Sequence, residues 1–309
     1  MEHLPSHDRA PWAEVAHPIS VPAYSPKLRV AAISFLNSAP LMWDFEHSPV
    51  KGSLTDRYEL HYTQPAQCAA ELLAGRADLG LIPVAALTPD LAIVPDCTIA
   101  SLDEVRSIQL ICKQSFALNS IRTIAADTAS LSSLAYAQVL FRKFIGSQPE
   151  FLAATADPIA MLRQADAALV IGDPALLALE AREQIEQAVG PCQWLDLAHE
   201  WHTRTLLPWV AAVWAVRPEA LLPAGVTAGQ LAVDLQHSRD HGLASTESLV
   251  REWTPRIGLP PSTIRHYLTH NIHYTLTPDC MHAIELFRSY AVEVDALSPL
   301  GPLRFLEGL

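Results

Sequence analysis

The segment SFLNSAPL, residues 34–41, carries the first side chains that could act on a substrate. It follows an apolar run, and its proline fixes the path of the chain as it leaves the segment. Asn37 offers a hydrogen-bond donor and an acceptor from one amide, and Ser38 adds a hydroxyl. Because asparagine is also a common turn former, a purely structural role is an equal alternative. We treat Asn37 as a candidate catalytic residue and Ser38 as a candidate substrate-binding residue.

A cluster of serines lies in DTASLSS, residues 127–133, between a predicted strand and a predicted helix. The cluster consists of Ser130, Ser132 and Ser133. Hydroxyls and free N–H groups at the start of a helix favour a bound anion. Capping the helix would need one serine only, so the cluster predicts a site for a substrate carboxylate.

Two further candidates for substrate binding each depend on one residue. Ser107 is a lone hydroxyl on a strand that we predict to cross between two lobes, although a buried serine bonded to the backbone is the default interpretation. Gly172 follows the apolar run 167–171 and permits a close approach of the backbone to a ligand. Asp173 beside it is predicted to cap the next helix.

Several common catalytic and cofactor-binding motifs do not occur in the sequence. It has no G-x-S-x-G, no P-loop and no G-x-G-x-x-G, which argues against a serine hydrolase of that type and against a nucleotide cofactor. Histidines recur at helical spacing, but neither the Glu of H-E-x-x-H nor a cysteine accompanies them. The five cysteines are widely spread and form no C-x-x-C pair. We therefore predict neither a metal nor a cofactor.

Short apolar runs, which are typical of buried strands, must position these residues. The runs are 28–35, 58–63, 78–83, 105–112, 121–126, 167–171 and 209–216. Helical patterns follow several of them, and only helices are predicted beyond Pro218. This alternation predicts an α/β fold.

The order of the elements predicts two lobes, one inserted into the other. Residues 27–112 plus 214–309 would form the first lobe, and residues 113–213 the second. Residues 1–26 are rich in proline and are expected to be a disordered or loosely attached arm. A ligand would lie in the crevice between the lobes.

Composition narrows the classes of partner. Hydrophobic residues make up 50% of the 309 residues and charged residues 17%, which favours a large buried core. The net charge of −12 argues against nucleic acid and against an anionic membrane surface. No signal peptide and no membrane span is predicted, so we expect a cytoplasmic monomer or homodimer that binds a small molecule.

Six segments together resemble one family, in type and in order. They are SFLNSAPL (34–41), AGRADLGLIPVAAL (74–87), SIQLICK (107–113), DTASLSSLAYAQVL (127–140), AALVIGDPAL (167–176) and DLAHEWHTRTLLPWVAAVWAVR (196–217). The sequence is similar to the MqnA family, the chorismate dehydratases of the futalosine route to menaquinone, from about Lys27 to its end.

The resemblance implies a two-lobed fold like that of type 2 periplasmic binding proteins, without a transport role. It also implies a hydro-lyase that converts chorismate, a dicarboxylate, into 3-[(1-carboxyvinyl)oxy]benzoate without a cofactor. Asn37 matches the active-site asparagine of the family, and Ser107 and the serine cluster match its hydroxyl-rich substrate pocket. In the route proposed for the family, the enolpyruvyl carboxylate of chorismate itself takes the ring proton.

Two segments depart from the family pattern. The family tends to have threonine at the position of Ser132, which keeps the hydroxyl. It often has T-G-L-P-F where this chain has Thr205-Leu206-Leu207-Pro208-Trp209, a change that alters the expected wall of the cleft. Two alternatives stay open: the related naphthoate synthase of the same pathway, MqnD, and a non-catalytic cytoplasmic solute-binding or sensor protein.

Overall fold

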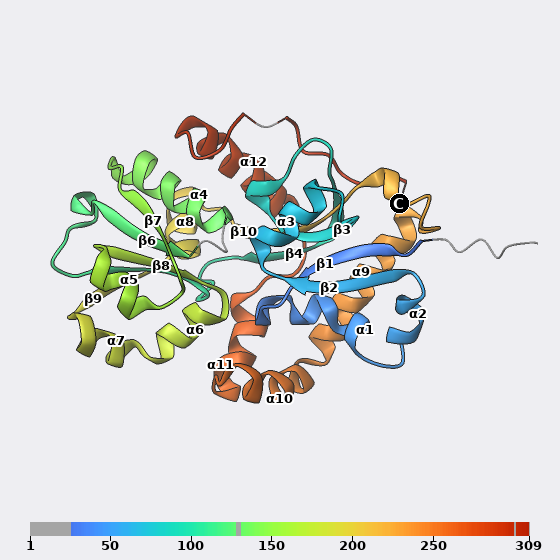
Figure 1. The fold of residues 1–309 in the computed structure, drawn as a ribbon, viewed down its shortest axis with the longest axis horizontal. Coiled ribbons are helices and arrows are strands. Elements are labelled where there is room, and N and C mark those ends of the chain that lie inside the picture. Colours follow the sequence, from blue (N-terminus) through green and yellow to red (C-terminus); the bar gives the residue numbers. More distant parts are fainter. Residues whose placement is uncertain (1–25, 128–130, 300, 309) are drawn as a thin grey trace, which may run out of the picture.

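A computed structural model describes residues 26–127, 131–299 and 301–308. Ser130 and almost all of the predicted N-terminal arm lie outside these residues. The described chain folds into two five-stranded sheets that lie side by side, each with helices packed around it (Figure 1). The predicted α/β class is therefore confirmed.

The first sheet has the strand order β2-β1-β3-β10-β4. Its strands are β1 Leu28–Ile33, β2 Tyr58–Thr63, β3 Leu79–Pro83, β4 Ala92–Ser101 and β10 Trp209–Val216. β1 runs parallel to β2 and β3, whereas β10 is antiparallel to β3 and β4. β1, β3 and β10 are almost wholly buried, which explains their near-continuous apolar sequences.

The second sheet has the order β7-β6-β8-β5-β9. Its strands are β5 Ile108–Lys113, β6 Thr123–Asp127, β7 Glu150–Ala154, β8 Ala167–Ile171 and β9 Cys192–Asp196. β6 is parallel to β7 and β8, and β5 is antiparallel to β8 and β9. Every residue of β8 is buried, as expected of a central strand.

Helices of two groups surround the sheets. Those near the first sheet are η1 Leu36–Met42, α1 Trp43–Glu46, α2 Lys51–Thr55, α3 Pro65–Leu73, η2 Val84–Ala86, η5 Pro218–Ala220, α9 Ala228–Ala244, α10 Thr246–Ile257, α11 Pro261–His266, η6 Tyr267–Asn271 and α12 Pro278–Glu293. Those near the second are η3 Leu118–Ser120, α4 Leu131–Val139, η4 Leu140–Ile145, α5 Pro158–Gln164, α6 Gly172–Glu180, α7 Arg182–Val189 and α8 Leu197–Thr205. α12 packs against both β10 and α4, so it holds the two groups together (Figure 1).

Sheet membership gives the two lobes sharper borders than the sequence does. The predicted border at residue 112 falls within β5, whose hydrogen bonds all lie in the second sheet. The border at residue 213 falls within β10, which belongs to the first sheet. Since a strand moves with the sheet that binds it, we propose that the lobes meet at the connecting segments 102–107 and 206–208.

Candidate active site

A cavity between the two sheets brings together most of the residues that the sequence singles out. About 490 Å³ of space free of protein atoms lies in it, part of which is open to solvent. Its lining consists of Ile33, Phe35, Asn37, Pro65, Pro83, Ile99, Ser107, Ile108, Ser132, Ser133, Ile171, Gly172, Trp209, Ala211 and Ala212. The lining therefore includes Asn37 and four of the candidate substrate-binding residues, contributed by both sheets.

Asn37 lies in η1, the tight helical turn that follows β1. The turn is fixed from the other lobe, because the backbone N–H of Leu36 donates to Oδ1 of Asp173 at 3.0 Å. Oδ1 of Asn37 is itself buried and has no hydrogen-bond partner among the described residues. An unpaired buried acceptor beside a cavity is a position at which a ligand can donate a hydrogen bond.

Ser38 supports this turn and does not line the cavity. Its hydroxyl is buried and lies 2.6 Å from the carbonyl oxygen of Ile33 and 2.8 Å from that of Phe35, to which it donates. The hydroxyl is thus engaged by the backbone, in contrast to the substrate contact that we predict from the sequence.

The serine cluster is divided by the structure. Ser132 and Ser133 are buried in the first turn of α4 and line the cavity. Oγ of Ser132 accepts from the N–H of Ala85 at 3.2 Å and donates to the carbonyl of Ala211 at 3.3 Å. It therefore ties α4 to the first sheet. Ser130, the third member, lies outside the described residues.

Ser107 meets a residue that sequence reasoning missed. Tyr267 is 1% exposed, and its hydroxyl lies close enough to the side chains of Ser107 and Asn37 to interact with both. Burial raises the pKa of Tyr267 far above its usual value, so the hydroxyl stays protonated. Tyr267 begins the π-helical turn η6. Such turns are frequent at functional sites, but no pattern in the sequence marks this one.

Gly172 is required where α6 begins. Its φ is +64°, and a Cβ there would lie 2.8 Å from the ring of Phe35. Only glycine allows both the left-handed backbone and this contact between the lobes.

Asp173 does not cap α6, contrary to the prediction from the sequence. The N-cap position is Ile171, and the carboxylate of Asp173 instead accepts the bond from Leu36 across the cleft. Burial raises the pKa of Asp173 to about 6, against an opposing effect of the Leu36 N–H. Asp173 is therefore a link between the lobes.

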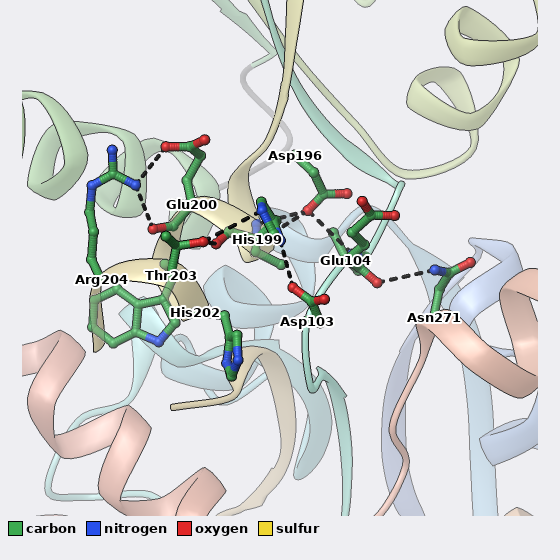
Figure 2. A network of polar contacts seen from close by, with 12 residues as sticks. Asp103, Glu104, Asp196, His199, Glu200, His202, Thr203, Arg204 and Asn271 are labelled. Carbon is green, nitrogen blue, oxygen red and sulfur yellow. Dashed lines mark hydrogen bonds and ion pairs between the residues drawn. The ribbon is translucent and has the colours of Figure 1, made fainter. Parts of the chain in front are cut away.

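The segment that carries Ser107 is held by the polar network in Figure 2. The carboxylate of Asp196 caps α8 and also accepts from the N–H groups of Val105 and Arg106. On the other side, Nδ2 of Asn271 donates to the carbonyl of Glu104 at 3.2 Å. Asn271 ends the same turn, η6, that Tyr267 begins. One turn thus binds the connection between the lobes through Asn271 and places Tyr267 beside Ser107.

The difference from the family pattern at residues 205–209 affects two positions, Leu206 and Trp209, in different ways. Leu206 ends α8 with a φ of +58°, and its side chain is 79% exposed, so it points away from the cavity. Trp209 is 1% exposed and forms part of the cavity wall. The expected change in the wall therefore comes from Trp209.

Neither a metal site nor a membrane span is present in the described part of the chain. No group of three or more His, Cys, Asp or Glu side chains there is arranged to hold a metal ion. No helix among residues 26–127, 131–299 and 301–308 combines the length and the apolar character that a membrane crossing needs.

Comparison with known protein families places this fold and site. A model of a family described as menaquinone biosynthesis matches residues 28–293. The chain belongs to this family. The resemblance found in the sequence is thereby confirmed, and the match includes Asn37, Ser107, Gly172 and Tyr267.

Individual relatives agree with the family assignment. The chain is 27% identical over 233 residues to the chorismate dehydratase of Thermus thermophilus, a match that covers 72% of this chain and 83% of the relative. The protein AF1704 of Archaeoglobus fulgidus superposes with a TM-score of 0.67 at 14% identity, covering 87% of this chain and 97% of the other. The periplasmic aliphatic sulphonate binding protein SsuA of Escherichia coli gives 0.60 at 16% identity, covering 92% and 95%. These structures confirm the predicted periplasmic-binding-protein-like fold.

The cavity of this menaquinone biosynthesis family member is uncharged. Among its described lining residues there is no Asp, Glu, His, Lys or Arg. Among the described lining residues, the polar groups that can hold a charged ligand are hydroxyls, amides and N–H groups. None of these side chains is a carboxylate, an imidazole or an amine that could serve as a general acid or base.

Proposed function

We propose that this protein is a chorismate dehydratase, a hydro-lyase that forms 3-[(1-carboxyvinyl)oxy]benzoate. The observation that carries the proposal is the cavity between the lobes, whose described lining has no charged side chain and which gathers Asn37, after β1, and Ser107, in the connection between the lobes, close to the hydroxyl of Tyr267. Membership of the menaquinone biosynthesis family and the similarity to the Thermus enzyme support it.

The reaction removes a proton and a hydroxyl from neighbouring ring carbons of chorismate. The C–H electron pair becomes the new ring double bond, the C–O bond to the hydroxyl breaks, and the departing hydroxide takes up a proton, in net terms the one removed from the ring, to leave as water. The ring becomes aromatic, so the elimination is downhill once it starts. No lining residue in the described chain is a carboxylate or an imidazole, which favours the enolpyruvyl carboxylate of the substrate as the base.

In this mechanism the protein contributes orientation and hydrogen bonds. The unpaired Oδ1 of Asn37 accepts from the hydroxyl that leaves, and thereby orients it. The hydroxyls of Ser107 and Ser133 line the cavity, where they can meet substrate oxygens, and most of the remaining wall is apolar. Positioning of this kind can lower a barrier by roughly 7–11 kcal/mol.

Incubation of the purified protein with chorismate tests the proposal. We expect chorismate to disappear and a product with the ultraviolet absorption of an aromatic ether to form, with the mass of chorismate less water. Chorismate that is bound but unchanged would instead indicate a solute-binding or sensor protein. Absence of both binding and turnover would reopen the naphthoate synthase alternative.

Replacement of Asn37 tests its assigned role. In Asn37→Ala we expect kcat to fall about a hundredfold with KM changed only a few-fold, because the amide acts mainly as the transition state forms. Steady-state kinetics with chorismate measure both constants. Asn119→Ala, at an exposed asparagine in η3, is the matched control and should keep wild-type kinetics. Near-normal turnover in Asn37→Ala would contradict the assignment.

A further inference from the structure

Two buried tryptophans on β10 lack a hydrogen-bond partner within the described chain. Nε1 of Trp209 and Nε1 of Trp214 are both buried, and neither finds an acceptor. Trp209 is 1% exposed and Trp214 is 0% exposed, so bulk solvent does not supply one either. A buried indole N–H usually finds an acceptor, and leaving it without one costs free energy.

The two tryptophans differ in their position relative to the cavity. Trp209 is part of the cavity wall, whereas Trp214 is not. The ring of Trp209 is held in place, since it packs against that of Tyr136 with 5.4 Å between centroids and its backbone pairs with Ser101 of β4. An indole fixed in this way cannot turn its N–H toward solvent without breaking the wall.

The rest of the wall explains why such a donor would matter. A substrate with two carboxylates enters a cavity without a cationic side chain in its described lining. The hydroxyl of Ser132 is already bonded to Ala85 and Ala211. Neutral donors must therefore hold the substrate, and an indole N–H can only donate. A carboxylate oxygen is its strongest partner.

We propose that the indole N–H of Trp209 donates a hydrogen bond to a carboxylate of the substrate and is a binding determinant of this site. This inference rests on the proposed function and extends it to a residue of the cavity wall. The unpaired donor of Trp209 and the unpaired acceptor of Asn37 then serve the two kinds of polar group that chorismate carries, a carboxylate and a hydroxyl.

Two matched variants, each of which shortens a buried tryptophan by one ring, separate this role from a structural one. Trp209→Phe removes the unpaired donor of a residue that lines the cavity, and Trp214→Phe removes an equally buried, equally unpaired donor on the same strand. We expect Trp209→Phe to raise KM for chorismate and Kd for the aromatic product about tenfold, the effect of one hydrogen bond to a charged group. Trp214→Phe should leave both constants at the wild-type value.

The wild-type protein provides a second, independent measurement. In ¹⁵N-labelled protein the indole N–H signals can be followed during titration with 3-[(1-carboxyvinyl)oxy]benzoate, and Trp209→Phe identifies the signal of Trp209. We expect that signal to move strongly downfield as the product binds, with the Trp214 signal nearly unmoved. The titration itself uses the wild-type protein, and the variant is needed only to assign the signal.

The outcomes distinguish the inference from the function on which it rests. A wild-type protein that neither binds nor converts chorismate overturns both. An active wild type overturns only the inference if Trp209→Phe binds the product as tightly as Trp214→Phe does. An indole signal of Trp209 that stays unmoved at saturation has the same meaning.

Discussion

At the scale of single residues, the hydroxyl of Tyr267 is the contact that organises the site. It lies close to Ser107, in the connection between the lobes, and to Asn37 in η1. Because it is buried beneath both, Tyr267 acts through them as a positioning residue.

Replacing Tyr267 by phenylalanine tests that role. We expect kcat to fall about tenfold, since Asn37 and Ser107 each lose a polar neighbour that helps to orient them, while KM changes little. Tyr274→Phe is the control, because its hydroxyl is also buried but has no partner within the described chain. Kinetics with chorismate compare the two variants, and equal effects on kcat would contradict a positioning role for Tyr267.

The sequence identifies site residues whose polar side chains lie near recognisable strands. It does not identify residues that reach the site only through the packing of distant segments. Asn37 and Ser107 stand at the ends of recognisable strands, so their convergence follows from the α/β pattern. In the sequence pattern, Tyr267 is one more apolar position of a predicted helix and has no feature of a site residue. Asp173 reads as a helix cap, because a sequence does not show that the N–H of Leu36 lies opposite it.

At the scale of elements, the start of α6 depends on Gly172. In Gly172→Ala we expect a loss of stability beyond the roughly 1–2 kcal/mol of a left-handed alanine, together with a higher KM, because the new methyl pushes Phe35 into the cavity. Gly146→Ala is the matched control: its φ is +76°, and nothing lies within 4 Å of the added Cβ. Chemical denaturation and kinetics measure the two effects. Equal changes in stability and KM in the two variants would show that the contact with Phe35 contributes to neither.

The end of α8 carries strain that can be relieved. Leu206 has a φ of +58° and an exposed side chain, so glycine there removes an unfavourable backbone conformation without loss of packing. We expect Leu206→Gly to raise the free energy of unfolding by about 1 kcal/mol. Leu222→Gly, at an equally exposed leucine without a positive φ, should give no gain. Urea denaturation tests both, and a destabilised Leu206→Gly would contradict the reasoning.

Most of the elements could be predicted from apolar periodicity, and three strands could not. β7 lies at the edge of its sheet and has no buried residue. The other two are β4 and β9. β4 contains Pro95, and the next residue, Asp96, has a φ of +69°, so its alternation is broken. β9 is short and mixes polar with apolar residues, because it lies at the edge of its sheet. All three strands are recognised by their neighbours in the sheet, which a local pattern does not contain.

At the scale of the whole molecule, stability is linked to pH through Asp173, which joins the two lobes. Its pKa is raised to about 6 by burial, whereas a carboxyl of this kind titrates near ~4 in the unfolded chain. The folded state therefore binds the proton more tightly. The contribution of Asp173 to stability is complete below about pH 4 and is lost as the pH rises through about 6.

Asp173→Asn separates this titration from the hydrogen bond. The amide oxygen can still accept from Leu36 but does not titrate, so we expect the decline in stability between about pH 4 and pH 6 to become shallower than in the wild type. Melting temperatures across this pH range measure the decline in stability. Arg256, whose charge lowers the pKa of Asp173, is kept in both proteins. A variant with the wild-type slope would show that another group is responsible.

The uncharged cavity within a chain of net charge −12 has a consequence for the kinetics of encounter. An anionic substrate is repelled at long range, and salt screens that repulsion over a Debye length of about 8 Å at physiological ionic strength. Inside the cavity, neutral donors hold the substrate at short range, where salt has little influence. Rising ionic strength should thus speed arrival and leave departure almost unchanged, the reverse of an enzyme that attracts its substrate with a ring of arginines.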